Sequence, residues 1–297
     1  MGDSLRQRLD VLERTQNEDG GWGYFPGKAT WMEPTVYAVL ALDGQRSLGP
    51  LERAWELIAS WQLPDGSWRP CMAVEGPGTW VTALGVHLCC WRGEFGQPFR
   101  RALKWLLNTQ GREGSWVLRA IAKLQPGGAD NDLSQTGWPW LRGASSWIEP
   151  TTQTILALRK AAARYSGVEA RVRDAEGFIL SRRCADGGWN YGSRRALGID
   201  LPSYPETTAL ALLGLQARQA ELGFSAAEYL QWVLENKART RMGRAWLSIA
   251  LRNLGGRAPV PKGDADDDVF LAALEALAHP DGNHAVFRVT AESVVCE

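Results

Sequence analysis

The sequence predicts an all-α fold built from pairs of helices, and two observations carry this prediction. A short motif, Gln-x-x-x-Gly-x-Trp, recurs along the 297 residues, and its first three copies begin at Gln16, Gln62 and Gln110. Each copy follows an amphipathic helical stretch and precedes a second helical stretch that carries few charges. A supersecondary unit that recurs at a near-constant interval of a few tens of residues is typical of helical repeat proteins.

Three copies of the motif are intact, over residues 16–22, 62–68 and 110–116, and two are degenerate. The fourth has Arg183 in place of Gln but keeps Gly187 and Trp189, and the fifth, over 278–284, keeps only its glycine. Glycine just past a helix end adopts the left-handed conformation that lets the chain reverse direction. The Gln amide is expected to bond open backbone groups at that helix end, and the Trp to cover the junction. We therefore interpret these residues as structural staples.

The two kinds of helix differ in their pattern. The stretches before the motifs, such as 51–61 and 99–107, have apolar residues on one face only, which predicts outer helices. The stretches after the motifs, such as 34–42 and 150–158, carry few charges on any face, which predicts buried inner helices. Residues 269–277 precede the fifth motif, so strict alternation predicts that they form an outer helix.

Composition excludes several classes of function. The chain has 33 basic and 33 acidic residues, and no basic run resembles the footprint of a nucleic-acid-binding protein. The amino terminus is charged where a secretory signal would be apolar, and no window is long and apolar enough to span a membrane. The five cysteines form no CxxC pair and suit reduced thiols. We expect a cytoplasmic protein.

The repeated Gln-x-x-x-Gly-x-Trp motif after outer helices resembles that of squalene-hopene and oxidosqualene cyclases, in the terpenoid cyclase and protein prenyltransferase superfamily. In organisation the resemblance covers residues from about 1 to 290. It implies a single (α/α) toroid domain over 1–297, with about five to six outer/inner helix pairs and parallel inner helices around an apolar cavity. Residues 123–146 are predicted to form an insertion loop over one mouth of the toroid.

Three glutamates, Glu33, Glu149 and Glu206, stand at the starts of predicted inner helices, each beside an aromatic residue. If these helices are parallel, the three carboxyl groups converge on one mouth. A carboxylate at a helix start also complements the helix dipole, so capping remains an alternative to a role in a ligand site. The candidate substrate-binding residues are Trp31, Trp80, Trp147, Tyr204, Tyr37, His87 and Arg244.

A second acidic group, Asp264, Asp266, Asp267 and Asp268, directly precedes residues 269–277. Its Asp-x-Asp-Asp pattern resembles the one with which class II terpene cyclases protonate an alkene or epoxide, and the resemblance makes Asp266 the proton donor. Crowded carboxyl groups in an apolar cavity keep one of their number protonated, and aromatic faces stabilise a carbocation. However, the family continues with Thr-Ala, whereas this chain has Asp268-Val269, and an outer helix would point away from the cavity. The alternative is a solvated acidic run that caps a helix.

The sequence therefore predicts an isoprenoid-binding protein, specifically a class II terpene cyclase-like enzyme (an isomerase or lyase). It would act on a long apolar polyprenyl or triterpene-type substrate by acid-initiated carbocation chemistry. The candidate catalytic residues are Asp264, Asp266, Asp267, Glu206, Glu149 and Glu33. Two alternatives stay open: a glycan-active toroid enzyme that uses paired glutamates, and a non-catalytic receptor or subunit for a hydrophobic ligand.

No cofactor and no metal are indicated, because the chain lacks an Asp-Asp-x-x-Asp site and its Cys184-Ala-Asp186 reverses the zinc-binding order of prenyltransferases. The expected partner is a small isoprenoid. A second domain, another copy of the chain and peripheral contact with a membrane stay open as further partners.

Overall fold

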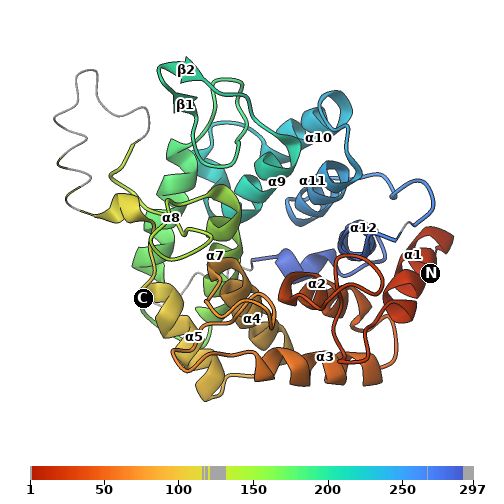
Figure 1. The fold of residues 1–297 in the computed structure, drawn as a ribbon. Helices are drawn as coiled ribbons and strands as arrows, with labels where there is room; N and C mark the ends of the chain where they lie inside the picture. The colour runs from red at the N-terminus through yellow and green to blue at the C-terminus, as the bar shows by residue number, and fades with distance from the viewer. Residues whose placement is uncertain (1, 116, 118–119, 121–131, 266, 290–297) are drawn as a thin grey trace.

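The computed structural model describes residues 2–115, 117, 120, 132–265 and 267–289, and the regular secondary structure of these residues is almost all helical (Figure 1). The inner helices are α2 (Met32–Leu42), α4 (Thr79–Arg92), α7 (Ile148–Ala161), α9 (Pro205–Gly214), α11 (Arg241–Asn253) and α12 (Val269–Ala278). The outer helices are α1 (Asp3–Arg14), α3 (Gly49–Ser60), α5 (Gln97–Leu107), α8 (Glu169–Ser181) and α10 (Ala226–Asn236). Short 3₁₀ turns lie at η1 (Arg112–Gly114), η2 (Gln216–Glu221) and η3 (His284–Phe287), and β1 (Arg195–Ala196) pairs antiparallel with β2 (Ile199–Asp200).

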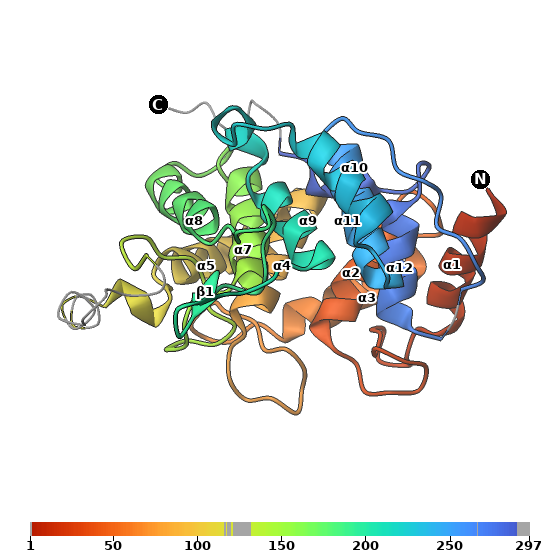
Figure 2. The same cartoon turned by 90° about the horizontal axis from the view of Figure 1, so that it is seen from above.

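The inner helices pack side by side in a closed ring, in the order α2, α4, α7, α9, α11, α12 and back to α2. The outer helices lie around this ring, and the loops that precede α2 and α4, in red and orange, project on one side of it (Figures 1 and 2). Parallel inner helices therefore start at one mouth of the toroid and end at the other. The predicted all-α toroid is confirmed.

The tryptophan of each staple is held by the same two hydrogen bonds. Its indole N–H donates to a carbonyl in the last turns of the preceding outer helix, from Trp22 to Leu12 (2.7 Å), Trp68 to Ile58 (2.8 Å) and Trp189 to Ile179 (2.7 Å). Its backbone N–H donates to a threonine hydroxyl in the next inner helix, at Thr35, Thr82 and Thr208. Each staple thus ties one outer helix to one inner helix.

The glutamine and glycine of the motif close the turn as predicted. The Gln16 amide donates to the Gly20 carbonyl at 2.7 Å, and Gln62 does the same with Gly66 at 2.9 Å. Arg183 takes the place of glutamine in the fourth staple, because its Nε donates to the Gly187 carbonyl at 2.8 Å. The φ angles of these three glycines are 93°, 94° and 92°, in the left-handed region. The interpretation of the motif as a structural staple is confirmed.

The third staple differs from the sequence prediction. Its tryptophan is Trp138, whose indole donates to the Leu106 carbonyl (2.9 Å) and whose backbone N–H donates to the Thr151 hydroxyl (2.8 Å). The prediction that Trp116 completes this staple is therefore wrong, and Trp116 itself lies outside the described residues. The physical reason is that an insertion falls inside the motif, so the tryptophan that bonds to the last turn of α5 stands at position 138.

A second set of backbone bonds stitches neighbouring inner helices together. The carbonyl two residues after each staple tryptophan accepts the N–H at the start of the adjacent inner helix in the ring. These bonds run to Tyr24 from Val269 (3.0 Å), to Pro70 from Met32 (2.8 Å), to Trp140 from Thr79 (3.0 Å) and to Tyr191 from Ile148 (2.9 Å). The first of them joins the last inner helix to the first repeat and closes the ring.

The prediction that residues 269–277 form an outer helix is wrong. Helix α12 lies in the inner ring between α11 and α2, and all ten of its residues are buried. Two inner helices, α11 and α12, follow each other directly, and the outer place beside α12 is taken by α1 from the start of the chain. A buried ion pair between Arg8 of α1 and Glu275 of α12 (2.8 Å) fastens this junction.

The far mouth of the toroid is closed by η3. Asn253 and Gln216 donate side-chain hydrogen bonds to the carbonyls of His284 and Phe287, at 2.9 and 2.8 Å. The Phe287 ring enters the ring of inner helices and lies 6.2 Å from Tyr37, 5.7 Å from Trp246 and 5.8 Å from His87. The resemblance implied an apolar cavity; at this end the interior is filled with aromatic side chains.

Candidate active site at the open mouth

The three glutamates occupy one position of the repeat. Glu33, Glu149 and Glu206 each lie two residues after the N-cap of an inner helix, whose N-cap residues are Trp31, Trp147 and Tyr204. Because the inner helices are parallel, this position recurs around the open mouth. The carboxyl groups are close enough that the charges of Glu33 and Glu206 both act on Glu149. The predicted convergence of these side chains is therefore found in the structure.

Electrostatics keep a proton in this acid cluster, which we define as Glu33, Glu149 and Glu206. Burial, followed by the negative charges of Glu33 and Glu206, raises the pKa of Glu149 to about 8. Burial also raises the pKa of Glu33, although a hydrogen bond from the Tyr24 hydroxyl at 2.5 Å opposes that rise. All three residues are half-buried. Glu149 is therefore protonated at neutral pH.

Aromatic rings surround the acid cluster. The Tyr24 ring lies 5.9 Å from Trp31 and 6.0 Å from Phe270, and Phe270 lies 5.1 Å from Tyr37. Tyr37 is fully buried beneath them, and its hydroxyl accepts a hydrogen bond from Gln153 at 2.6 Å. A protonated carboxyl group beside aromatic faces can donate a proton and stabilise the cation that results.

Asp264, Asp267 and Asp268 lie at the same mouth, on the segment before α12. Asp264 and Asp267 are exposed, and Asp267 forms an ion pair with Arg14 at 3.4 Å. Asp268 is the N-cap of α12 and accepts a hydrogen bond from the Leu271 N–H at 2.9 Å. Asp266 lies outside the described residues. Because α12 is an inner helix, its start belongs to the open mouth, and Tyr24 contacts both this start and Glu33.

The remaining predicted residues are spread more widely. Trp80 occupies the glutamate position in α4 and packs edge-to-face on Trp140 at 5.1 Å. Arg244 is exposed and lines a separate cavity with Lys262, because it lies four residues, and not two, after the N-cap of α11. His87 is buried at the closed end, where its Nε2 is 2.8 Å from the Val286 carbonyl. Burial lowers its pKa to about 3, so its imidazole is neutral.

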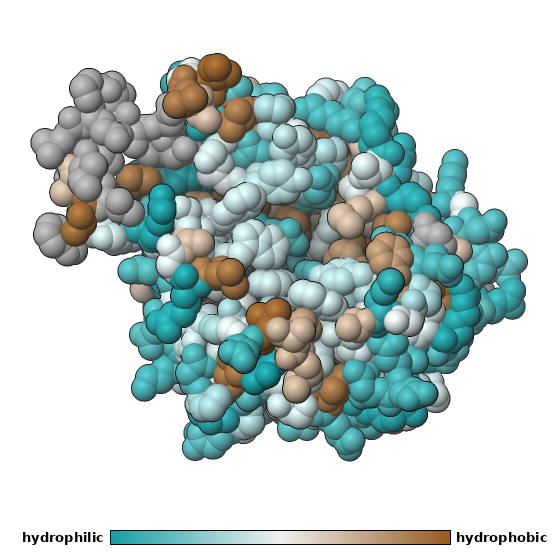
Figure 3. Space-filling model, viewed as in Figure 1, coloured by the Kyte–Doolittle hydropathy of each residue, from teal (hydrophilic) through white to brown (hydrophobic). Residues whose placement is uncertain are grey.

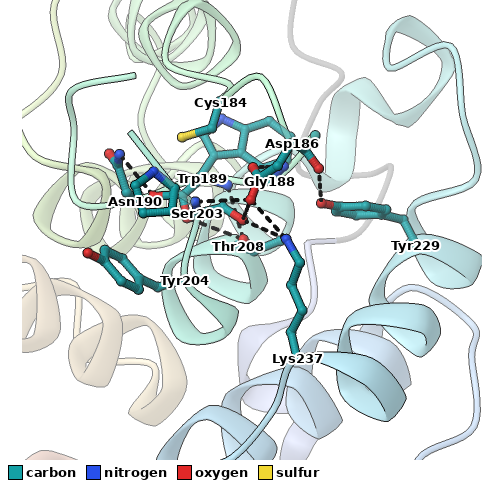
Figure 4. Close-up of polar contacts among 12 residues, drawn as sticks. Cys184, Asp186, Gly188, Trp189, Asn190, Ser203, Tyr204, Thr208, Tyr229 and Lys237 are labelled. Atoms are coloured by element: carbon teal, nitrogen blue, oxygen red, sulfur yellow. Dashed lines mark hydrogen bonds and ion pairs between the residues drawn. The ribbon is translucent and has the colours of Figure 1, made fainter. Parts of the chain in front are cut away.

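The polar residues around the fourth staple form a structural network (Figure 4). Asp186 accepts hydrogen bonds from Lys237 and from the Ser203 hydroxyl, both at 2.8 Å. Partial burial would raise the pKa of Asp186, but these bonds outweigh it and lower the pKa to about 2. Asp186 also accepts a hydrogen bond from the backbone N–H two residues later, as Asp19 and Asp65 do in the first two staples. This aspartate therefore belongs to the repeat. No group of metal-ligating side chains occurs among the described residues.

Two contributors to the site were missed from the sequence. Tyr24 and Phe270 belong to different ends of the chain and meet only because α12 closes the ring. One signal was available for Tyr24, since it is the second residue after a staple tryptophan, the position whose carbonyl caps the next helix in the ring.

The curated relatives found by sequence are terpenoid synthases, although no family model matches the chain. Drimenyl diphosphate synthase of Streptantibioticus cattleyicolor is 41% identical over 78 residues, which is 26% of this chain and 14% of that protein. The Streptomyces showdoensis enzyme of the same name is 38% identical over 86 residues, which is 16% of its length. Lanosterol synthase of Pneumocystis carinii is 25% identical over 257 residues, which is 73% of this chain and 33% of that protein. The chain thus spans a minor part of each relative.

Similar solved structures include the type II terpene cyclase MstE from Scytonema, in complex with geranylgeranyl dihydroxybenzoate. It superposes with a TM-score of 0.54 at 17% identity, over 92% of this chain and 76% of that one. The chain has a terpenoid cyclase-like α/α-toroid fold. The family 8 endoglucanase Cel10 of Klebsiella pneumoniae superposes with a TM-score of 0.58 at 14% identity, over 92% of this chain and 97% of that one. Because two different chemistries share this toroid, function has to be argued from the site.

In the described part of the chain, no helix is both long enough and apolar enough to cross a bilayer. Figure 3 looks onto the open mouth, and its topmost brown group belongs to the β1–β2 hairpin, where Leu197 and Ile199 are 95% and 67% exposed.

Proposed function

We propose that this protein is a terpene cyclase-like enzyme that acts on a long apolar polyprenyl or triterpene-type substrate by acid-initiated carbocation chemistry. The observation that carries the proposal is the acid cluster, in which Glu149 holds a proton at neutral pH beside aromatic rings. The relatives named drimenyl diphosphate synthase and lanosterol synthase support the same substrate class.

The reaction begins with proton transfer from the carboxyl group of Glu149 to a double bond or epoxide of the substrate. The O–H bond breaks, a C–H or epoxide O–H bond forms, and the positive charge passes to carbon. The rings of Tyr24, Trp31 and Phe270 face this region, and each cation–π contact contributes about 0.5–2 kcal/mol. Loss of a proton from the cation to the Glu149 carboxylate ends the reaction and restores the acid. If water takes this proton instead, Glu149 regains a proton from solvent.

The Asp-x-Asp-Asp segment offers a second assignment of the proton donor, with Asp266 in that role. The start of α12 lies at the same mouth as the acid cluster, so both donors would serve one substrate site. Either assignment gives acid-initiated chemistry, and variants distinguish them.

The test is incubation of the protein with farnesyl diphosphate, geranylgeranyl diphosphate and squalene, followed by product analysis. We expect cyclic product from the wild type and a loss of about 10²–10⁴-fold in Glu149→Gln, the usual contribution of a general acid. Glu235→Gln, on the exposed face of α10, is the matched control and should keep full yield. Loss in Asp266→Asn with full yield in Glu149→Gln would move the donor to Asp266. Absence of cyclic product from every substrate would overturn the proposal.

A glycan-active enzyme is the second candidate, because three carboxyl groups beside aromatic rings line a mouth of a toroid shared with an endoglucanase. Release of reducing ends from cello-oligosaccharides, abolished in Glu149→Gln and in Glu206→Gln, would favour this candidate over the cyclase. Binding of a polyprenyl ligand without turnover would instead indicate a non-catalytic receptor, which a second domain or subunit could complete.

A further inference from the structure

A cavity of about 470 Å³ lies beside the acid cluster, between the loops that precede α7 and α9. Its walls include Arg182 at the end of α8, Glu113 of η1, and the aromatic residues Trp147, Tyr191 and Tyr204. Figure 4 shows Tyr204 and Asn190 on this side of the fourth staple. None of these residues has a role in the acid-initiated step.

The unusual group in this cavity is the guanidinium of Arg182. Its side chain is only 3% exposed and stacks on Phe178 at 4.7 Å, yet neither its Nε nor its Nη1 has a hydrogen-bond partner in the described part of the chain. A guanidinium stays charged in proteins, so Arg182 is a buried cation with unused donors. Buried groups of this kind are normally paired, because leaving them unpaired is costly.

The other buried arginines of the described residues follow that rule. Arg8 donates to the Glu275 carboxylate at 2.8 Å, and Arg159 donates to the Glu176 carboxylate at 2.7 Å. Arg182 is therefore an exception within its own structure, and its unused donors suit an acceptor from outside the chain.

The charged groups around Arg182 do not offset its burial. Burial lowers the pKa of Arg182, the charges of Glu113 and Asp132 raise it by less, and Arg194 lowers it further. Neither Nε nor Nη1 has a hydrogen-bond partner in the described residues. Both oxygens of Glu113 accept the Ser146 N–H, at 3.0 and 3.2 Å, so this carboxylate is directed to the loop before α7. The cavity thus combines a buried cation with two donors that have no acceptor among the described residues.

The aromatic residues form a continuous wall. Trp147 lies 5.8 Å from Tyr191, and Tyr191 lies 5.1 Å from Tyr204, measured between ring centroids. The three side chains are 39%, 44% and 39% exposed, although they are large and apolar. Trp147 and Tyr204 directly precede the helices that carry Glu149 and Glu206, so the wall runs between the Arg182 cavity and the acid cluster.

We propose that this cavity binds the anionic group, a carboxylate or a phosphate, of an organic ligand on Arg182, while the apolar body of the ligand lies along Trp147, Tyr191 and Tyr204. Charge-assisted hydrogen bonds to a guanidinium are the strong ones, and the aromatic wall gives the body its contact area. The inference rests on the proposed function only in taking a polyprenyl chain as the apolar body.

The test measures equilibrium binding of farnesyl phosphate, farnesoate and farnesol by titration calorimetry at constant ionic strength. These probes share one chain and differ in the head group. We expect at least one anionic probe to bind tenfold or more tightly than farnesol, and the better of the two anions identifies the head group. In Arg182→Met, which keeps the packing on Phe178, the preference for the anion should disappear. Equal binding of farnesol and both anions, or an unchanged preference in Arg182→Met, would overturn the proposal.

Controls separate binding from folding and from catalysis. Without ligand, Arg182→Met should keep or raise the melting temperature, because it removes a buried cation with unpaired donors. Arg171→Met should lower the melting temperature, because it removes a guanidinium that is hydrogen-bonded to the Gly137 carbonyl. If Arg182→Met fails to fold, Tyr191→Ala remains as a test. It should weaken the binding of all three probes and keep the preference for the anion. Loss of that preference would contradict the assignment of anion binding to Arg182. Binding is measured without turnover, so failure of the cyclase reaction leaves this result readable.

Discussion

Glu149→Gln is expected to make the protein more stable at alkaline pH and to change little at acidic pH. Glutamine keeps the size and hydrogen-bonding groups of the protonated side chain but cannot ionise. In the wild type, the pKa of Glu149 rises from 4.5 in the unfolded chain to about 8 in the folded protein. Between these values the unfolded chain loses the proton while the folded protein keeps it, so folding binds a proton and wild-type stability falls as pH rises.

The magnitude follows from that difference. Raising the pKa from 4.5 to about 8 corresponds to about 5 kcal/mol, at 1.36 kcal/mol per pH unit. Because Glu149 is only half-buried, solvent screens its charge and we expect roughly half of this value, about 2–3 kcal/mol, to be observed. The stability gained by Glu149→Gln should therefore grow from near zero at pH 4.5 to about 2–3 kcal/mol at pH 8.

Urea unfolding followed by tryptophan fluorescence at pH 4.5, 6.5 and 8 measures this gain directly. Glu235→Gln, on an exposed outer face, is the control and should show no pH-dependent difference. A stability difference between Glu149→Gln and wild type that stays constant with pH, or that decreases as pH rises, would mean that Glu149 is ionised at neutral pH. That result would refute both the electrostatic reasoning and the assignment of Glu149 as proton donor.

Three further predictions concern the fold. Trp138→Phe should cost about 1–2 kcal/mol in urea unfolding by removing the indole bond to α5, whereas Trp232→Phe at a 46% exposed position should cost little; equal costs would contradict the staple. Gly44→Ala, at a φ of 67° with open space around the new Cβ, should lower the free energy of unfolding by about 1–2 kcal/mol. Gly66→Ala should lower it by more, because its φ is 94° and the new Cβ would lie 2.6 Å from the backbone of α5. A lower melting temperature for Gly44→Ala than for Gly66→Ala would contradict this prediction. Glu275→Gln should cost about 3–5 kcal/mol, because it leaves two arginines without a buried carboxylate partner, and a cost below about 1 kcal/mol would show that this junction does not fasten the ring.

The parts of this protein that could be predicted from the sequence depend on short-range geometry. The Gln16–Gly20 bond, the left-handed glycine and the indole bond from Trp22 to Leu12 all act within ten residues, so the motif alone specifies them. Repetition then carries the pattern around the ring. The meeting of Glu33, Glu149 and Glu206 at one mouth follows from their equal places in the first, third and fourth repeats.

Other features were decided only by the tertiary structure, because they depend on contacts between distant parts of the chain. Helix α12 is an inner helix because α1, from the opposite end of the sequence, fills the outer place beside it. Trp138 takes the place that the sequence gives to position 116, because its indole N–H bonds to the Leu106 carbonyl. That bond depends on how the inserted residues fold back onto α5, which the motif does not specify. The unpartnered donors of Arg182 are equally invisible in the sequence, where a single arginine reveals neither its burial nor its lack of an acceptor. Sequence periodicity thus determined the repeat and its acids, and closure of the ring decided which groups they meet.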